Sequence, residues 1–333
     1  MLTAILTAGL VLARIEARTV AQAPPNIILI VSDDHAWSDY GFMGHAVVRT
    51  PALDKLASEG TLYARGYVPT ALCRPSLATL LTGRYPHQHG ITGNDPPGDA
   101  ATRTQAVSRA SMVDVFKRNK VLPALLAEKG YVSFQSGKWW EGRPEDFGFT
   151  KAMTHGDVAR GGRHGDEGLT VGRQGMQPIY DFIDSAAGKP FFVWYAPFLP
   201  HTPHTPPDRL LKKYQALDLA PAVARYYAMI EWLDETVGQL LAHVERRSLR
   251  DNTIVIYLAD NGWIQSPGPQ PPTRAKMSPY DAGIRTPVIV RWPGRITATR
   301  DDKTLVGSID VMPTLLRAAG LTPPAELPGI DLL

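Results

Sequence analysis

The feature that most constrains the fold of this chain is a continuous apolar run over residues 26–32, which ends in two aspartates. The run reads Asn-Ile-Ile-Leu-Ile-Val-Ser, and Asp33 and Asp34 follow it directly. A strand with apolar side chains on both faces must be covered on both faces, which is typical of a central strand in an α/β protein. Ligands of such sheets bind at the carboxyl ends of the strands. The sequence therefore predicts a functional site around the two aspartates.

A second apolar run, over residues 253–258, also leads into polar residues, Asp260 and Asn261. Adjacent carboxylates repel one another unless a cation or a shared proton relieves them. The two strand ends together offer only oxygen ligands, which suit a hard cation such as Ca²⁺ or Mg²⁺. Plain turns are the alternative interpretation of Asp-Asp and Asp-Asn-Gly, but they do not explain why both buried strands end in carboxylates.

The one cysteine of the 333 residues stands at the start of a third motif, Cys-Arg-Pro-Ser-Leu-Ala-Thr-Leu-Leu-Thr-Gly-Arg, residues 73–84. Pro75 suits a first helical turn, and Gly83 suits the end of the helix. A side chain at the start of such a helix faces unpaired backbone N–H groups, beside which an anion can bind. A buried structural thiol is the alternative reading of the cysteine alone.

The rest of the chain alternates predicted strands and helices, which favours one large α/β domain. Residues 94–120 and 155–175 carry no clear periodicity, and we predict surface loops near the site for both. One predicted helix begins at residues 50–57 and is closed by Gly60, and the others cover residues 122–129, 180–186, 222–247 and 309–319. Further strands cover residues 131–135, 191–195 and 288–291.

Composition narrows the function classes. A net charge of +3 and the lack of a basic, aromatic-rich track argue against nucleic acid as a partner. A single cysteine excludes an internal disulfide. Residues 2–13 are apolar, and a small-x-small pattern at 21–23 suggests a cleaved export signal over 1–23 and a periplasmic or secreted protein, with a disordered or helical N-terminus as the alternative. No later stretch is apolar and long enough for a membrane span.

Five motifs in order resemble type I sulfatases of the alkaline-phosphatase-like superfamily, across residues 25–331. They are Asp33-Asp34, the Cys73-x-Pro-Ser stretch with its Leu-Thr-Gly-Arg, Gly137-Lys138-Trp139, Pro200-His201-x-Pro, and Asp260-Asn261 followed by Lys276 and Gly-Ile-Arg-x-Pro. The resemblance implies an α/β sandwich with a central mixed sheet flanked by helices. It also implies a catalytic domain over 24–333 without the C-terminal subdomain that is usual in the family.

The resemblance further implies the roles of the site residues. Residue 73 would be oxidised from cysteine to formylglycine by a formylglycine-generating enzyme, and its hydrate would be the nucleophile. Asp33, Asp34, residue 73, Asp260 and Asn261 would hold the metal, Ca²⁺ or Mg²⁺. Lys138, His201 and Lys276 would be catalytic, and weaker candidates for substrate binding are Arg74, His87 and His204. Two positions depart from the family pattern: Leu77 replaces an arginine, and Trp140 replaces a histidine.

The function implied by the resemblance is hydrolysis of sulfate esters, of an aryl or a glycan substrate. Two alternatives are a phosphonate or phosphodiester hydrolase with the same site, and a weakly active relative that binds sulfated glycans. The motifs do not identify the ester, and the loops at 94–120 and 155–175 are predicted to select it.

Overall fold

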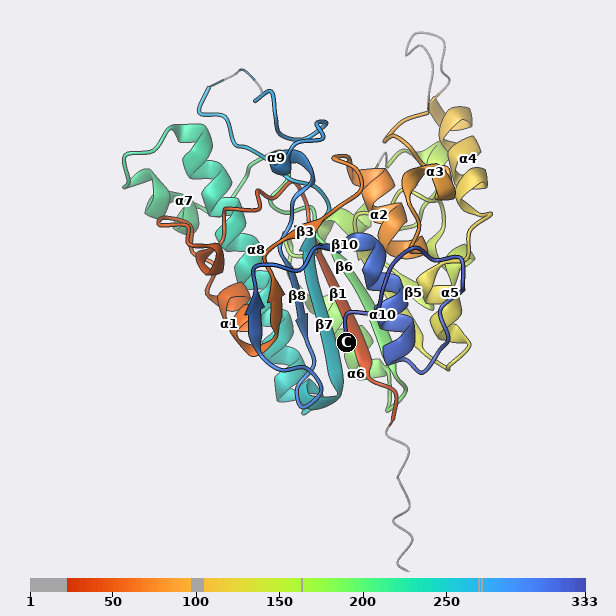
Figure 1. Ribbon diagram of the computed structural model, residues 1–333. Coiled ribbons are helices and arrows are strands. Elements are labelled where there is room, and N and C mark those ends of the chain that lie inside the picture. The colour runs from red at the N-terminus through yellow and green to blue at the C-terminus, as the bar shows by residue number, and fades with distance from the viewer. Residues whose placement is uncertain (1–22, 97–104, 163, 269, 271) are drawn as a thin grey trace, which may run out of the picture.

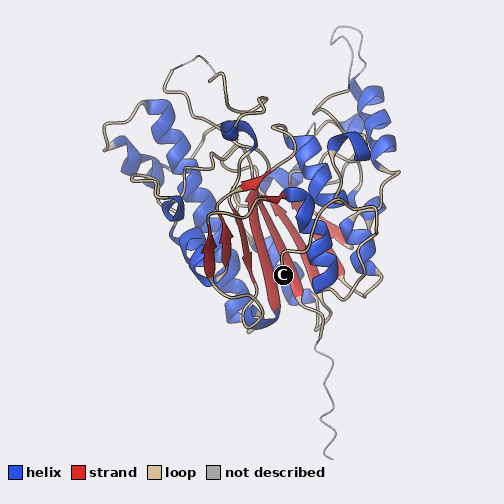
Figure 2. Cartoon of the chain, in the orientation of Figure 1, coloured by secondary structure: helices blue, strands red, loops and turns tan. Residues whose placement is uncertain are grey.

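The computed structural model describes residues 23–96, 105–162, 164–268, 270 and 272–333. The predicted export signal, apart from its last residue, lies outside this range. The described residues form an α/β fold in which the strands run through the middle of the molecule between helices (Figures 1 and 2). The predicted fold class, a central mixed sheet flanked by helices, is confirmed.

The main sheet is mixed, and its larger part is parallel. The strands, in spatial order, are β5 (Lys151–Ala152), β4 (Val132–Gly137), β6 (Phe191–Ala196), β1 (Asn26–Ser32), β7 (Thr253–Ala259), β8 (Val288–Arg291), β2 (Thr61–Tyr63) and β9 (Thr299–Asp301). The first five strands are parallel to one another, β8 is antiparallel to β7 and to β2, and β9 is parallel to β2. A small second sheet pairs β3 (Gly66–Tyr67) with β10 (Val306–Gly307).

Strand β1 explains why the sheet is covered on both faces. Its side chains alternate between two hydrophobic clusters: Ile27 and Leu29 belong to one, Ile28 and Ile30 to the other, and all four are fully buried. The first cluster includes side chains of α2 (Cys73–Thr82), α4 (Gln105–Phe116), α5 (Leu122–Ala127) and α10 (Val311–Ala318), and the second those of α1 (Pro51–Glu59), α6 (Gln177–Ser185) and α8 (Pro221–Arg246).

Shorter elements complete the described part of the chain. Helix α7 (Asp208–Gln215) packs against α8 through Leu210 and Tyr214. The remaining helical turns are α3 (Pro86–His89), α9 (Asp281–Ile284) and the 3₁₀ segments η1 (Gly41–Met43), η2 (Pro144–Phe147), η3 (Val158–Arg160), η4 (Glu167–Thr170), η5 (Arg250–Asn252) and η6 (Ser308–Asp310). Among the described residues, no helix combines the length and the apolar character that a membrane span requires.

Helix α2 has the ends that the sequence predicts. It begins at Cys73, and all ten of its residues are buried. It ends at Gly83, which has a φ of 64° and whose N–H donates to the carbonyl oxygen of Thr79. This left-handed conformation favours glycine, which has no Cβ.

The predicted loop over residues 94–120 is wrong for its second half, because residues 105–116 form α4. Met112, Val113 and Phe116 point into the first cluster, a helical spacing that the charged and small residues around it conceal. Residues 97–104 of this stretch lie outside the described range.

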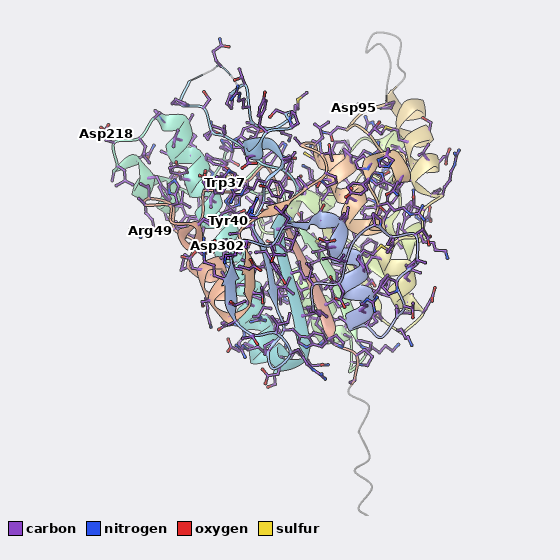
Figure 3. The ribbon with its side chains drawn as sticks, in the orientation of Figure 1. Trp37, Tyr40, Arg49, Asp95, Asp218 and Asp302 are labelled. Carbon is purple, nitrogen blue, oxygen red and sulfur yellow. The ribbon has the colours of Figure 1, made fainter. Side chains whose placement is uncertain are left out.

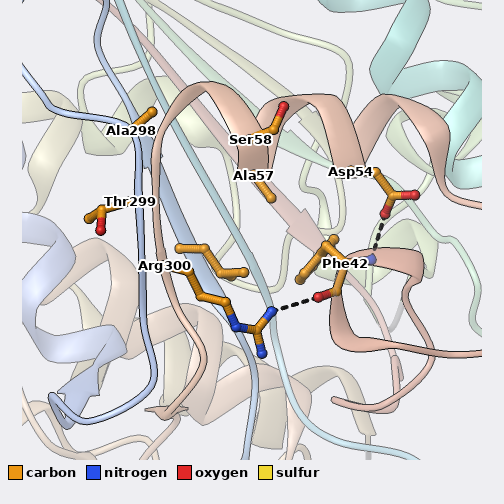
Figure 4. A pocket seen from close by; sticks show the side chains of 8 residues that line it. Phe42, Asp54, Ala57, Ser58, Ala298, Thr299 and Arg300 are labelled. Carbon is orange, nitrogen blue, oxygen red and sulfur yellow. Dashed lines mark hydrogen bonds between the residues drawn. The ribbon is translucent and has the colours of Figure 1, made fainter.

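The edge strand β9 is hydrogen-bonded to the segment before α1 (Figure 4). Arg300 donates to the carbonyl oxygen of Phe42 at 2.7 Å, and the N–H of Phe42 donates to Asp54 at 2.8 Å. A surface pocket lies between them, lined by Phe42, Asp54, Ala57, Ser58, Leu62, Ala298, Thr299 and Arg300. It contains none of the site residues predicted from the sequence.

His89, the last residue of α3, is part of the core. It is 1% exposed, its Nδ1 accepts from the N–H of Ile91 at 3.1 Å, and its Nε2 lies 3.2 Å from the Thr79 hydroxyl. Burial lowers the pKa of His89 to about 4. The folded state therefore favours the neutral imidazole.

We expect the stability of the protein to fall as the pH falls from about 6.5 to about 4, because the unfolded chain binds a proton at His89 that the folded chain excludes. The loss in the free energy of unfolding between these pH values should be smaller in His89→Gln, by up to about 2–3 kcal/mol. Urea unfolding of both proteins at pH 7, 6 and 5 measures it. His87→Gln is the control, since His87 is exposed. Parallel pH profiles for the unsubstituted and His89→Gln proteins would contradict the assignment.

Candidate active site

The parallel strands bring the predicted residues to one edge of the sheet. Strands β4, β6, β1 and β7 are adjacent and parallel, so their carboxyl ends meet. Three of the backbone N–H groups that follow these strands donate to the next strand or its loop: Asp33 to Leu199 (2.9 Å), Lys138 to Ala196 (2.7 Å) and Asp260 to Ser32 (2.8 Å). These bonds fix the starting point of each side chain in the site.

The oxygen side chains that follow β1 and β7 form one cluster. Asp34 has a φ of 56°, an uncommon conformation for a residue with a Cβ. Its N–H donates to Oδ1 of Asp260 at 3.1 Å, and Asn261 Nδ2 donates to Oδ1 of Asp34 at 2.7 Å. Asp33, Asp34, Asp260 and Asn261 are each at most 3% exposed. The cluster expected from the two strand ends is therefore present.

Two lysines and the cysteine complete this cluster. Lys138 Nζ donates to Oδ1 of Asp33 at 2.7 Å and lies 3.6 Å from Oδ2 of Asp260. Lys276 Nζ donates to Oδ1 of Asp34 at 2.6 Å and lies 3.1 Å from Sγ of Cys73. That sulfur is 4.0 Å from Oδ1 of Asp33. Both lysines thus contact the carboxylates, and Lys276 also contacts residue 73.

His201 reaches the cluster from the loop after β6. Its Nδ1 lies 2.6 Å from the carbonyl oxygen of Thr202, which fixes Nδ1 as the donor, and its Nε2 lies 3.4 Å from Oδ2 of Asp34. Phe198 stacks on the imidazole, with ring centroids 4.3 Å apart. Arg173 holds this loop by donating to the carbonyl oxygens of Phe198 and His201.

Burial and crowding control the charges of the site. Burial and the nearby Asp33 raise the pKa of Asp260 to about 7. Burial also raises the pKa of the Cys73 thiol to about 12, and burial followed by Lys138 lowers the pKa of His201 to about 4. The raised pKa of Lys138 reflects the surrounding acidic groups, Asp33 first, which outweigh its burial.

The charge balance of these groups suits a bound cation. Three carboxylates face two ammonium groups, which leaves one negative charge when all are ionised. Oδ2 of Asp33, Oδ2 of Asp260 and Oδ1 of Asn261 are buried and accept no hydrogen bond from the described residues. Buried oxygens without a donor are costly. A divalent metal would coordinate all three oxygens and change the net charge of the site from negative to positive. The residues present therefore fit the predicted ion.

Side chains behind the cluster support it. Tyr226 of α8 is fully buried, donates to the carbonyl oxygen of Asp34 at 3.2 Å and accepts from the N–H of Ala36 at 3.1 Å. Trp37 and Tyr40 lie on the segment that leaves β1 (Figure 3). Trp37 is covered by the guanidinium of Arg285, at 3.8 Å from the ring centroid.

The three weaker candidates for substrate binding lie in different surroundings. The guanidinium of Arg74 is buried and forms an ion pair with Glu141, and its role in substrate binding stays a prediction. His87 is exposed and stacks on Tyr85, with centroids 5.8 Å apart. His204 is half-buried, with its ring centroid 5.5 Å from that of Tyr226.

Sequence reasoning missed His164, which lies beside the site in the predicted loop at 155–175. Its ring centroid is 5.5 Å from that of Trp140, 5.0 Å from Phe198 and 6.1 Å from His201. An imidazole therefore contacts Trp140, the position where the family pattern has its histidine. No local motif marks His164, because only the folded loop brings it to this place.

The fold thus gathers carboxylates, two lysines, His201 and Cys73 at the carboxyl ends of parallel strands. The Sulfatase family model matches residues 25–321, and the chain belongs to that family. N-Acetylgalactosamine-6-sulfatase of Canis lupus familiaris is 33% identical over 94% of the chain, and the ulvan-active sulfatase of Formosa agariphila is 28% identical over 96%. A crystal structure titled Ps i-CgsB has a TM-score of 0.76 at 27% identity and covers 93% of this chain and 75% of its own.

The chain covers only part of the length of the curated relatives. The chain spans 66% of the canine enzyme and 59% of the ulvan-active sulfatase. Phosphonate monoester hydrolase of Agrobacterium radiobacter shares the fold, with a TM-score of 0.66 at 19% identity, and covers 92% of this chain and 76% of its own.

Leu77, which replaces the family's arginine, lies in the first hydrophobic cluster and is 4% exposed. We expect Leu77→Arg to lower the free energy of unfolding by about 3 kcal/mol or more, because it buries a guanidinium without a carboxylate partner. Urea unfolding measures the loss, and Leu77→Met, which keeps the volume, is the control. Equal stability of the arginine variant would show that the site accepts a charge.

Proposed function

We propose that this protein hydrolyses sulfate esters. The observation that carries the proposal is the set of buried oxygens without donors, Asp33, Asp260 and Asn261, surrounded by Lys138, Lys276 and residue 73. Membership of the sulfatase family supports it. A sulfate ester is a monoanion, and a site with two ammonium groups and a metal-compensated carboxylate cluster attracts it.

Two groups outside the twenty amino acids belong to the proposal. Asp33, Asp34, Asp260 and Asn261, with residue 73, would hold Ca²⁺ or Mg²⁺, which would polarise the sulfate oxygens. A formylglycine-generating enzyme would oxidise Cys73, and the hydrated aldehyde would supply the attacking hydroxyl. The unmodified thiol suits this attack poorly, because burial holds its pKa at about 12.

The chain's own side chains then have distinct roles. Lys138 and Lys276 stabilise the negative charge on the sulfate oxygens in the transition state. His201 binds the ester oxygen through Nε2, because Nδ1 is committed to the carbonyl oxygen of Thr202. A bound anion raises the pKa of His201, so the imidazole gains a proton with the substrate and delivers it to the departing alcohol.

We further propose a role for a second imidazole, that of His164. It lies beside Trp140 and His201, and it would accept a proton when sulfate is released from residue 73.

A sulfated glycan is the substrate class that we favour. The canine relative is named for a sulfated amino sugar, and the structure titled Ps i-CgsB has also been solved in complex with k-i-k-neocarrahexaose. We propose a periplasmic or secreted location because of the export signal predicted over residues 1–23.

The test is a sulfate-release assay on the purified protein with 4-nitrophenyl sulfate and sulfated galactosamine, and with a phosphonate monoester for comparison. Elemental analysis accompanies it. We expect sulfate release, a stoichiometric amount of calcium or magnesium, and slower turnover of the phosphonate. Faster turnover of the phosphonate would favour the alternative hydrolase. Binding of sulfated glycan without sulfate release, by a protein whose residue 73 is converted, would favour the glycan-binding relative.

A further inference from the structure

A buried ion pair links the residue after the cysteine to the segment after Lys138. Arg74 Nε donates to Oε1 of Glu141 at 2.8 Å, and Arg74 Nη2 donates to Oε2 at 2.6 Å. The two side chains are 0% and 4% exposed. This is the bidentate arrangement that fixes both the distance and the angle between a guanidinium and a carboxylate.

Arg74 is held on its other sides as well. Its backbone N–H donates to Oδ1 of Asn94 at 2.9 Å, and its Nη1 lies 3.1 Å from Sδ of Met112. Its Cζ lies 5.9 Å from the ring centroid of Trp140. Removing two charges from water is costly, and apolar side chains of the same size are often equally stabilising. Stability alone therefore does not account for this pair.

The position of the pair suggests what it does. Arg74 is the neighbour of Cys73, and Glu141 lies three residues after Lys138. Cys73 Sγ and Lys138 Nζ approach the same atom, Oδ1 of Asp33, at 4.0 and 2.7 Å. The ion pair thus closes a ring of contacts that begins and ends at Asp33.

We propose that Arg74 and Glu141 are positioning residues that set residue 73 against Lys138. The inference rests on the proposed function, in which these two groups act on one sulfate. A displacement of about 1 Å between reacting groups can cost about 100-fold in rate. The pair touches neither substrate nor metal in this role.

The test compares the unsubstituted protein with Glu141→Gln and with the double variant Arg74→Met/Glu141→Leu. The double variant leaves no charge unpaired, so it should fold with a nearly unchanged melting temperature. We expect its kcat, expressed per formylglycine determined by mass spectrometry, to fall about 10- to 100-fold with KM little changed. Glu141→Gln should lower kcat and the melting temperature together.

The matched control is the pair Arg291–Glu59, 3.2 Å apart, in which the arginine is also buried. In the strand register, Arg291 of β8 lies opposite Val255, near the start of β7. The pair therefore lies at the other end of the strands from the site. Arg291→Met/Glu59→Leu should leave kcat unchanged. Full activity of the Arg74→Met/Glu141→Leu protein would overturn the proposal and leave the pair a purely structural role.

A second measurement does not depend on activity. Crystal structures of the unsubstituted protein and the double variant give the distance from Cβ of residue 73 to Nζ of Lys138. We expect a change of about 1 Å. An unchanged distance refutes the positioning role even if the proposed sulfatase activity is absent. A changed distance in a protein without sulfatase activity supports the positioning role and rejects only the proposed function.

Discussion

Asp260→Asn should abolish turnover, with a loss of at least about 10³-fold, and should also remove the stabilisation that Ca²⁺ gives to the protein. Asp260 is 1% exposed, and its Oδ2 has no hydrogen-bond donor among the described residues. An ion that binds only the folded state adds about 2.7 kcal/mol at 100 times its Kd. The amide lacks the charge that would hold the ion, so both effects should disappear together.

The same variant should be more stable than the unsubstituted protein when both are free of metal. Asp33, Asp34 and Asp260 repel one another, and the amide removes one of the three charges without changing the shape. Thermal unfolding with EDTA and with Ca²⁺ measures both effects. Asp251→Ala is the control, since the Asp251 side chain is 88% exposed and precedes the start of β7, whereas Asp260 follows its end. A melting temperature of the unsubstituted protein that does not respond to Ca²⁺ would contradict the metal site.

Cys73→Ala should eliminate activity, by at least about 10⁴-fold, while the fold is retained. The substitution removes the sulfur-bearing carbon's functional group, from which the aldehyde would be made. An enzyme loses nearly all of its activity when a nucleophile that acts as a unit with its partners is removed. The side chain is small and lies at the first position of α2, so the cost to stability should be modest. Circular dichroism and sulfate release on the same preparation measure the two effects.

Activity should also scale with the converted fraction of residue 73. Leu77 stands where the family motif has an arginine, and the resemblance implies that the modifying enzyme recognises this arginine. We therefore predict a mixture of cysteine and formylglycine at residue 73 in a heterologous host. Peptide mass spectrometry of several preparations, each with its specific activity, gives the relation. Ser76→Ala is a nearby control that leaves the cysteine intact. Full activity in a preparation that contains only cysteine would overturn the proposed chemistry.

The sequence predicts the centre of the fold well because β1 and β7 are apolar throughout. Such strands must be covered on both faces, and the polar residues after them can lie only at the carboxyl edge. Asp33, Asp34, Asp260 and Asn261 follow from that argument. In the structure, hydrogen bonds join Asp34 to Asp260 and Asn261, and Lys138 lies between Asp33 and Asp260. Helix α2 and its end at Gly83 follow from local backbone preferences in the same way.

Contacts between segments that are distant in sequence could not be predicted. Arg74 looks like a candidate ligand until Glu141, 67 residues later, is seen to bind it. His164 enters the site through a loop without periodicity. Helix α4 is concealed because its core-facing side chains among the described residues, such as Met112 and Phe116, stand between charged and small residues.

The burial of Cys73 sets a limit on the order of events during biosynthesis. At 2% exposure, the thiol of the folded chain is out of reach of any enzyme that must enclose it. The oxidation that we propose for this residue would therefore compete with the closing of α2 against the sheet, and its extent would depend on two rates rather than on an affinity. Slower folding, at lower temperature for example, would lengthen the interval in which the nascent chain can be modified.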